Sequence, residues 1–339
     1  MYILKQQPTD FIVTEQSSHN LSEDGKFAYF TLKKTNLNTL DAVRIIAKAL
    51  NIKEKQVGFA GSKDKNAVTS QVCSIPKNKK EQLLSLSFKN IEITFLGYQD
   101  EPVSLGNLEE NQFEIIVRNL DDFTIEKIKY LANYFDEQRF SLHNKDIGKH
   151  IIKKEFKEAI KLIKDSRSEE HLERHEKDYV GAIKKLPKRL LMMYVHAYQS
   201  YLWNRTLAEY LRTNTKVLKT VKYSLGEFVF VKHPENYLDL NIPMIGFGSE
   251  NLEPEQVQEI IYDIMLKENL SYMDFVVKQI PELSLEGGLR KAFTEIKNLE
   301  TGKIEEDDLN YGMKKVKFIF TLGKGSYATL AIKKIITLE

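Results

Sequence analysis

An aspartate between two lysines is the feature of this sequence best suited to chemistry. Asp64 lies between Lys63 and Lys65, in a glycine-containing connection between two strand-like runs. Neighbouring ammonium groups favour the ionised form of a carboxyl group, so this arrangement predicts an ionised carboxylate that is available as nucleophile or base. The same residue types are common in hairpin turns, which leaves an ordinary structural turn as the alternative.

The elements that would position Asp64 are short strands. Residues 56–60 are apolar and residues 68–73 alternate in polarity, which predicts two strands joined by a tight turn. Further strands are predicted at 11–15, 27–32, 91–96, 113–118, 228–232 and 316–322. Helices are predicted at 40–50, 124–135, 149–164, 190–211, 255–268 and 327–337, with Ser326 as the N-cap of the last.

The order of these elements indicates one domain inserted into another. Residues 1–137 mix strands and helices, residues 138–283 are mainly helical, and residues 284–339 return to a strand and a helix. We therefore expect the first and last segments to share one sheet. A length of 339 residues with 42% hydrophobic residues suits two cores.

The composition bears on the compartment in which the protein works and on the kind of partner it binds. The single cysteine, Cys73, cannot form an internal disulfide, and no segment has the length and apolar character of a signal peptide or a membrane span. We expect a cytoplasmic protein. The net charge is only +2, but residues 143–189 hold 14 Lys and Arg against 9 Asp and Glu. This segment could attract an RNA backbone, or it could form solvated helices with local ion pairs.

Five segments together indicate a family. The segment 61–71, GSKDKNAVTSQ, resembles the signature A-G-x-K-D-(K/R)-x-A-x-T-x-Q of the TruD family of tRNA pseudouridine synthases. The other four segments, in the family's order, are 10–15 DFIVTE, 111–113 NQF, 133–140 NYFDEQRF and 325–329 GSYAT. Asp136 and Ser141 replace the family's usual glycines, and Tyr327 stands where some members have Phe.

The resemblance implies a fold and a reaction. The expected fold is α+β: a mixed-sheet pseudouridine synthase catalytic domain, 1–137 and 284–339, with an inserted, mainly helical domain at 138–283. The expected reaction is the isomerisation of uridine to pseudouridine in tRNA, at position 13 of the D-arm, in a cleft between the domains. The reaction involves no redox step and no phosphate transfer, so we expect no cofactor and no metal. A monomer is the default expectation.

The resemblance also assigns residues to the site. Asp64 is the expected catalytic residue, either attacking the base or accepting a proton from the ribose. Substrate-binding or supporting roles are expected for Glu15, Lys63, Asn111, Phe113 and Tyr327. Lys63 would steady the Asp64 charge or a phosphate, and Glu15 would orient Lys63. The amide of Asn111 would bind the uracil edge or backbone, and the two rings would form walls. A core position for Phe113 and a turn role for Asn111 are the structural alternatives.

Other functions stay open on the sequence alone. A non-catalytic RNA-binding protein of the same fold would bind tRNA without changing it. A base hydrolase acting in the same cleft would release free uracil. A pseudouridine synthase could also act on another RNA.

Overall fold

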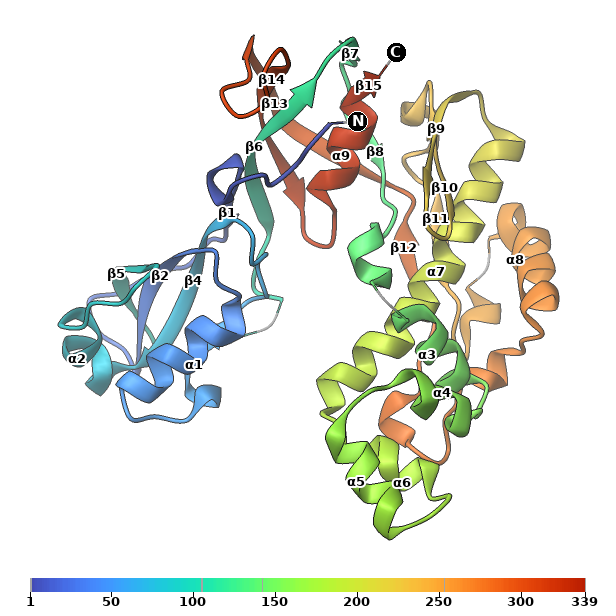
Figure 1. The fold of residues 1–339 in the computed structure, drawn as a ribbon, viewed down its shortest axis with the longest axis horizontal. Coiled ribbons are helices and arrows are strands. Elements are labelled where there is room, and N and C mark those ends of the chain that lie inside the picture. Colours follow the sequence, from blue (N-terminus) through green and yellow to red (C-terminus); the bar gives the residue numbers. More distant parts are fainter. Residues whose placement is uncertain (1, 105, 142, 253, 339) are drawn as a thin grey trace. The chain divides into compact units, whose positions relative to one another are not determined.

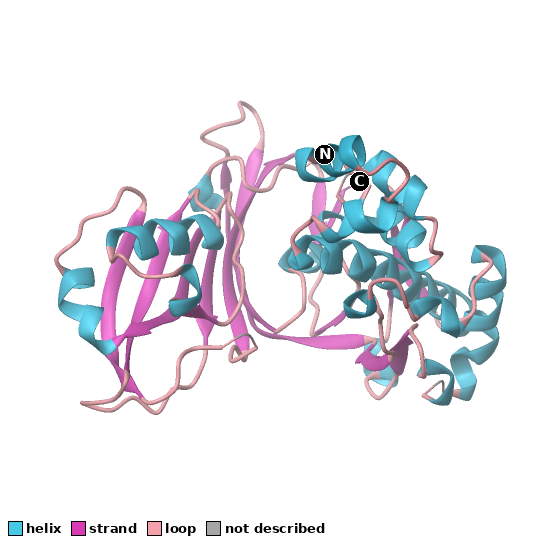
Figure 2. Ribbon diagram, turned by 90° about the horizontal axis from the view of Figure 1, so that it is seen from below, coloured by secondary structure: helices cyan, strands magenta, loops and turns pink. Residues whose placement is uncertain are grey.

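The computed structural model describes residues 2–104, 106–141, 143–252 and 254–338 (Figure 1). The chain forms two compact units: unit 1 comprises 1–129, 295–328 and 335–339, and unit 2 comprises 130–294 and 329–334. Strands dominate unit 1, whereas helices dominate unit 2 (Figure 2).

Unit 1 is built on a mixed sheet with strand order β5-β2-β4-β1-β6-β14-β13, and β3 pairs with β4. Its strands are β1 Phe11–Gln16, β2 Phe27–Thr35, β3 Gly58–Phe59, β4 Val68–Pro76, β5 Ile91–Gln99, β6 Glu110–Leu120, β13 Phe293–Glu306 and β14 Lys314–Gly323. The pair β1–β4 is parallel, and the neighbouring pairs β2–β4, β1–β6 and β6–β14 are antiparallel. The sheet joins the beginning and the end of the chain, because β6 pairs with β1 on one side and with β14 on the other.

Helix α1, Thr39–Ala49, covers part of this sheet (Figure 1). Its buried side chains follow the helical repeat: Ala42, Val43, Ile46 and Ala47. They pack in one core cluster with inward side chains of β2 and β4: Phe30, Leu32, Cys73 and Ile75. The amphipathic pattern predicted at 40–50 therefore forms the expected helix, which buries its apolar stripe against the sheet. The short helix α2, Lys80–Leu84, adds Leu83 to the same cluster.

One helix prediction is wrong, and a second helix is confirmed but ends earlier than predicted. Residues 124–135 form two short strands, β7 Phe123–Ile125 and β8 Tyr130–Ala132, instead of a helix. The last helix, α9 Ala328–Ile335, gives way to a strand, β15 Ile336–Leu338. β7 and β15 pair with each other, Ile125 opposite Ile336. This pairing brings together segments far apart in the sequence, so it overrides their local helical pattern.

Unit 2 is mainly helical and carries two small strand pairs. Its helices are α3 Asn144–Ile152, α4 Phe156–Leu162, α5 Ser166–Arg174, α6 Tyr179–Lys184, α7 Lys188–Asn214 and α8 Glu255–Glu268. Its strand pairs are β9 Val217–Tyr223 with β10 Gly226–Val231, and β11 Asn241–Met244 with β12 Gly288–Lys291. The predicted helix 149–164 is two helices, because Lys154 between them adopts a left-handed φ of 61°.

The core of unit 2 surrounds α7. Trp203 is completely buried there, and its indole nitrogen donates to the carbonyl of Ile242 at 3.1 Å. None of the helices in the described ranges is long and apolar enough to cross a membrane.

Asp136 explains one departure from the family pattern. Its φ of −80° is open to any residue, so no glycine is needed there. Its carboxylate accepts a hydrogen bond from Lys333 Nζ at 2.6 Å and another from Thr329 Oγ1. Asp136 therefore ties the segment 133–140 to helix α9.

Candidate active site

The loop that carries Asp64 spans 60–67, between β3 and β4, and is wider than the tight turn predicted. Two side-chain hydrogen bonds hold it to α1 and β4, and a third joins those two elements to each other. The hydroxyl of Thr39 accepts from the Lys63 amide at 2.9 Å and donates to Gln71 Oε1 at 3.0 Å. The amide of Gln71 donates to the Gly61 carbonyl at 3.0 Å. Thr39 and Gln71 are each only 1% exposed, so the loop is fastened from inside the protein.

Lys63 and Glu15 form a buried ion pair beneath this loop. The Lys63 ammonium lies 2.5 Å from Glu15 Oε2, and the side chains are 5% and 0% exposed. The second oxygen, Oε1, accepts from the Val72 amide at 3.3 Å. The ammonium of Lys63 therefore faces Glu15 and not the carboxylate of its neighbour Asp64.

Asp64 instead pairs with a residue that sequence reasoning missed. Lys5 Nζ lies 3.3 Å from Asp64 Oδ1, and the Asp64 side chain remains 34% exposed. The Lys5 ammonium also lies over the ring of Phe11, 4.0 Å from its centroid. This geometry leaves a carboxylate that is charge-paired, directed by a cation and still open to a ligand.

Asn111 shares a sheet face with Glu15, because the two residues lie directly opposite each other on β6 and β1. Its Oδ1 atom is buried and accepts no hydrogen bond in the described part of the chain. An unpaired buried acceptor is costly, so it is a candidate to bind a donor supplied by a ligand.

Phe113 lies on the same face, two residues along β6, but it is only 7% exposed. Its ring packs edge-on against Phe11 at 6.1 Å and stacks on Phe320 at 5.7 Å. Phe113 is therefore mainly a core residue, the alternative to a substrate-binding role. Its ring supports Phe11, the ring over which the Lys5 ammonium lies.

Tyr327 follows strand β14 at the same end of the sheet as Asn111. Leu322 pairs with Asn111, and the Lys324 amide donates to the Glu109 carbonyl at 3.1 Å. The helix α9 begins at Ala328, so Tyr327 directly precedes the helix. The Tyr327 side chain is half-buried.

All six predicted site residues therefore lie in unit 1. The structure joins Glu15 with Lys63 directly, and it places Asn111 opposite Glu15 and Lys5 against Asp64. Nothing near Lys5 in the sequence indicates its role. Lys34, a second residue that was missed, did leave a signal. It continues the inward-facing alternation of Phe30 and Leu32 on β2 and is completely buried.

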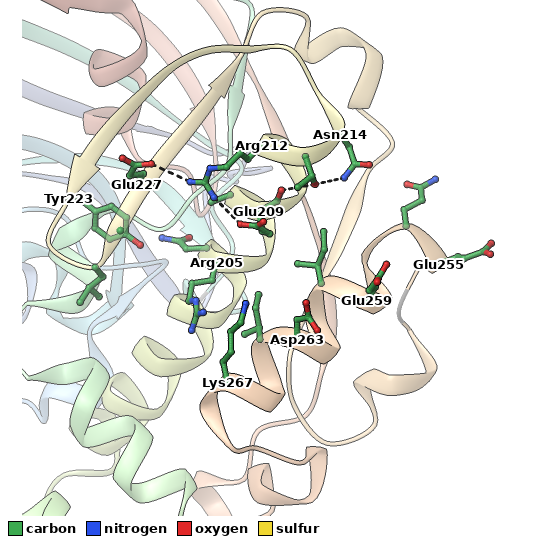
Figure 3. A pocket seen from close by; sticks show the side chains of 18 residues that line it. Arg205, Glu209, Arg212, Asn214, Tyr223, Glu227, Glu255, Glu259, Asp263 and Lys267 are labelled. Atoms are coloured by element: carbon green, nitrogen blue, oxygen red, sulfur yellow. Dashed lines mark hydrogen bonds and ion pairs between the residues drawn. The ribbon is translucent and has the colours of Figure 1, made fainter.

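A separate cavity of about 580 Å³ lies within unit 2, between α7, α8 and the β9–β10 hairpin (Figure 3). None of the six predicted site residues lines it. Its carboxylates are Glu209, Glu227, Glu255, Glu259 and Asp263, and its cations are Arg205, Arg212 and Lys267. Arg212 bridges Glu209 and Glu227. The excess of acidic groups makes this cavity a poor site for a phosphate backbone.

The lysine-rich segment 143–189 forms helices α3 to α6. Several of its charges pair locally, including Lys161 with Glu158 at 2.8 Å and Arg167 with Asp165 at 2.7 Å. His171, on α5, lies 2.9 Å from the Asp178 carboxylate. These local ion pairs are of the kind expected for solvated helices, and the RNA-binding face stays a prediction.

Comparison with solved structures defines the class of fold. A protein from Methanosarcina mazei, described as "Putative tRNA pseudouridine synthase D (TruD)", superimposes with a TM-score of 0.69 at 24% identity, over 98% of this chain and 92% of that one. The chain is therefore an α+β protein with the mixed-sheet fold predicted from its sequence.

Sequence comparison then identifies the family. The family described as tRNA pseudouridine synthase D (TruD) matches residues 2–171 and 164–335. A tRNA pseudouridine synthase D from Aquifex aeolicus is 32% identical, over 98% of this chain and 97% of that protein. A protein from Nanoarchaeum equitans named "Probable tRNA pseudouridine synthase D" is also 32% identical, over 98% of both chains. The chain belongs to the TruD family and is an enzyme of the isomerase class.

Proposed function

We propose that this protein converts uridine to pseudouridine in tRNA, at position 13 of the D-arm, and that Asp64 is the catalytic residue. The observation that carries the proposal is the Asp64 carboxylate itself. It is paired with Lys5 at 3.3 Å, one-third exposed, and presented by a loop that buried hydrogen bonds hold in place. The names of the relatives support tRNA as the substrate.

The reaction needs little besides a placed carboxylate. The C1′–N1 bond breaks, the uracil turns without leaving, and a C1′–C5 bond forms. The proton lost from C5 is balanced by one gained at N1. A carboxylate can assist by bonding to the substrate or by taking a proton from the ribose, and Asp64 carries the charge for either role. The target base must leave its stack to reach the carboxylate.

The neighbouring residues fit supporting roles. Glu15 holds Lys63, which keeps the segment beside Asp64 fixed. The unpaired Oδ1 atom of Asn111 can accept an N–H of the uracil. Phe113 packs against Phe11 beneath Lys5, and Tyr327 supplies a half-buried ring at the same end of the sheet as Asn111.

We also propose that the catalytic domain comprises residues 1–137 and 284–339, with 138–283 as an inserted domain. The strand-rich unit 1 contains all six predicted site residues, which supports this arrangement. The boundaries differ, because residues 130–137, 284–294 and 329–334 belong to unit 2.

The test uses unmodified tRNA with uridine at position 13 and the same tRNA with cytidine there. Pseudouridine is mapped by carbodiimide treatment and primer extension for the wild type, for Asp64→Asn and for Asp100→Asn, an exposed aspartate after β5. We expect a stop at position 13 with the wild type and with Asp100→Asn, and none with Asp64→Asn.

Each other result would contradict one part of the proposal. Tight tRNA binding without a stop would indicate a non-catalytic binding protein. Release of free uracil would indicate a hydrolase. A stop elsewhere, or only on another RNA, would keep the synthase and replace its target. An active Asp64→Asn variant would refute the catalytic role of Asp64.

A further inference from the structure

Lys34 is a lysine in the interior of the catalytic unit. It lies on β2, on the sheet face that α1 and the Asp64 loop cover, and its accessible surface is 0%. Strands β4 and β5 place Thr69 and Ile91 opposite it. A lysine is almost never fully buried without a partner, because removing an ammonium from water costs several kcal/mol.

The partners of this ammonium are backbone carbonyls. Lys34 Nζ donates to the Leu37 carbonyl at 2.5 Å and to the Asp64 carbonyl at 2.8 Å. Within the described residues, no carboxylate accepts a hydrogen bond from it. The buried lysine therefore donates its hydrogen bonds to the main chain, and one of the acceptors is the backbone of Asp64, whose side chain is the candidate catalytic carboxylate.

The other loop contacts act on residues beside Asp64. Gln71 holds the carbonyl of Gly61, Thr39 holds the amide of Lys63, and the Ala67 carbonyl accepts from the Asn36 amide at 3.1 Å. At Asp64 itself, Lys5 contacts the side chain and Lys34 contacts the backbone. Two lysines from different segments therefore hold Asp64, one through its carboxylate and one through its backbone carbonyl.

We infer that Lys34 is a positioning residue for the reaction proposed above: its ammonium anchors the Asp64 backbone to β2 and so sets the direction of the catalytic carboxylate. The inference rests on the proposed role of Asp64. A misplacement of about 1 Å at a reacting group can lower the rate by about 100-fold, so an anchor at this atom affects turnover more than tRNA binding.

The charge on Lys34 gives the anchor a pH dependence. The charged groups that act on it are Asp64 and Lys63, both from the loop. Thr69 and Ile91, opposite it on the sheet, carry no charge. Burial lowers the pKa of Lys34 to about 8, with Asp64 opposing the shift and Lys63 adding to it. As the pH rises through about 8, the ammonium becomes an amine, whose hydrogen bonds to carbonyls are weaker.

The experiment compares Lys34→Met with Lys33→Met. Lys33 is the next residue on β2, points to the opposite face, and forms an ion pair with Glu92 in which its side chain is 44% exposed. Initial rates of pseudouridine formation are measured from pH 6.5 to 9.5 for both variants and the wild type. Circular dichroism and tRNA affinity are measured on the same samples.

We expect kcat to fall about 10- to 100-fold in Lys34→Met, with KM for tRNA within about twofold of the wild-type value. The wild type and Lys33→Met should lose kcat as the pH rises through about 8, whereas the residual activity of Lys34→Met should lack this alkaline limb. An unchanged kcat in Lys34→Met would overturn the inference.

If Lys34→Met does not fold, the wild type alone decides the question. Amide hydrogen exchange of residues 61–67, corrected for the intrinsic pH dependence, should speed up through about pH 8 together with the loss of kcat. A wild-type kcat that stays level to pH 9.5 would overturn the inference. A wild type that leaves tRNA unmodified would remove the proposed function and this inference together.

Discussion

The ion pair of Lys63 and Glu15 is buried, so the loss of either charge should measurably lower the free energy of unfolding. Glu15→Gln keeps an oxygen for the Val72 amide but leaves the Lys63 ammonium, whose side chain is 5% exposed, without its counter-charge. Removing one partner of a buried pair typically costs about 3–5 kcal/mol. We therefore expect the free energy of unfolding to fall by about 3 kcal/mol in Glu15→Gln, and by a similar amount in Lys63→Met.

The double variant, Glu15→Gln with Lys63→Met, removes both charges. Replacing a buried pair by uncharged groups of similar size is often close to neutral, so the double variant should be more stable than either single variant. The resulting coupling free energy in a double-mutant cycle should be about 3 kcal/mol or more in magnitude.

Urea unfolding, followed by far-ultraviolet circular dichroism, measures this coupling. A matched control is available in Lys33 and Glu92, which lie 3.0 Å apart with side chains 44% and 70% exposed. Their cycle should give less than about 1 kcal/mol, because water screens exposed pairs. The reasoning would be refuted if the Glu15–Lys63 coupling were as small as that of the control pair.

Three further predictions concern other residues of unit 1. Arg118 is 2% exposed and donates to Asp10 and Asp307, so Arg118→Met should lower the free energy of unfolding in urea by about 3–5 kcal/mol; a loss below about 1 kcal/mol would contradict this. Burial works to raise the pKa of Asp307, but hydrogen bonds led by the Asn119 amide lower it to about 2, below the ordinary 3.8. Ionised Asp307 therefore stabilises the fold above about pH 4, and this contribution, about 2 kcal/mol, disappears as the pH falls through about 2. The free energy of unfolding, measured against pH, should fall more steeply in acid for the wild type than for Asp307→Asn. Superimposable curves for the two proteins would contradict this. Asn111→Leu should lower activity on tRNA at least about 10-fold without reducing the melting temperature, because its Oδ1 atom has no partner to lose among the described residues. A large drop in melting temperature would instead indicate a structural role.

The comparison of sequence and structure separates local from long-range information. The strands around 11–15, 27–32 and 68–73 and the helix at 40–50 were predictable, because alternation and helical repeat record which side of each element is buried. The helix predicted at 124–135 failed because β7 depends on a partner, β15, from the other end of the chain. The strand β13, Phe293–Glu306, was missed for the same kind of reason. Its outer half is largely exposed and polar, so pairing with β14 and not an apolar pattern defines it.

By itself, the sequence determined the family, the strand-rich and helical parts of the chain, and the candidate carboxylate, because motifs and periodicity are carried by residues close together in the chain. Only the tertiary structure decided which cation meets which carboxylate. Lys63 adjoins Asp64 in sequence yet pairs with Glu15, whereas Lys5 and Lys34 reach Asp64 from distant segments. These pairings follow from the register of β1, β2 and β4 and from the path of the loop above them. An ion pair depends on distances of a few ångströms in space, which spacing along the chain does not record.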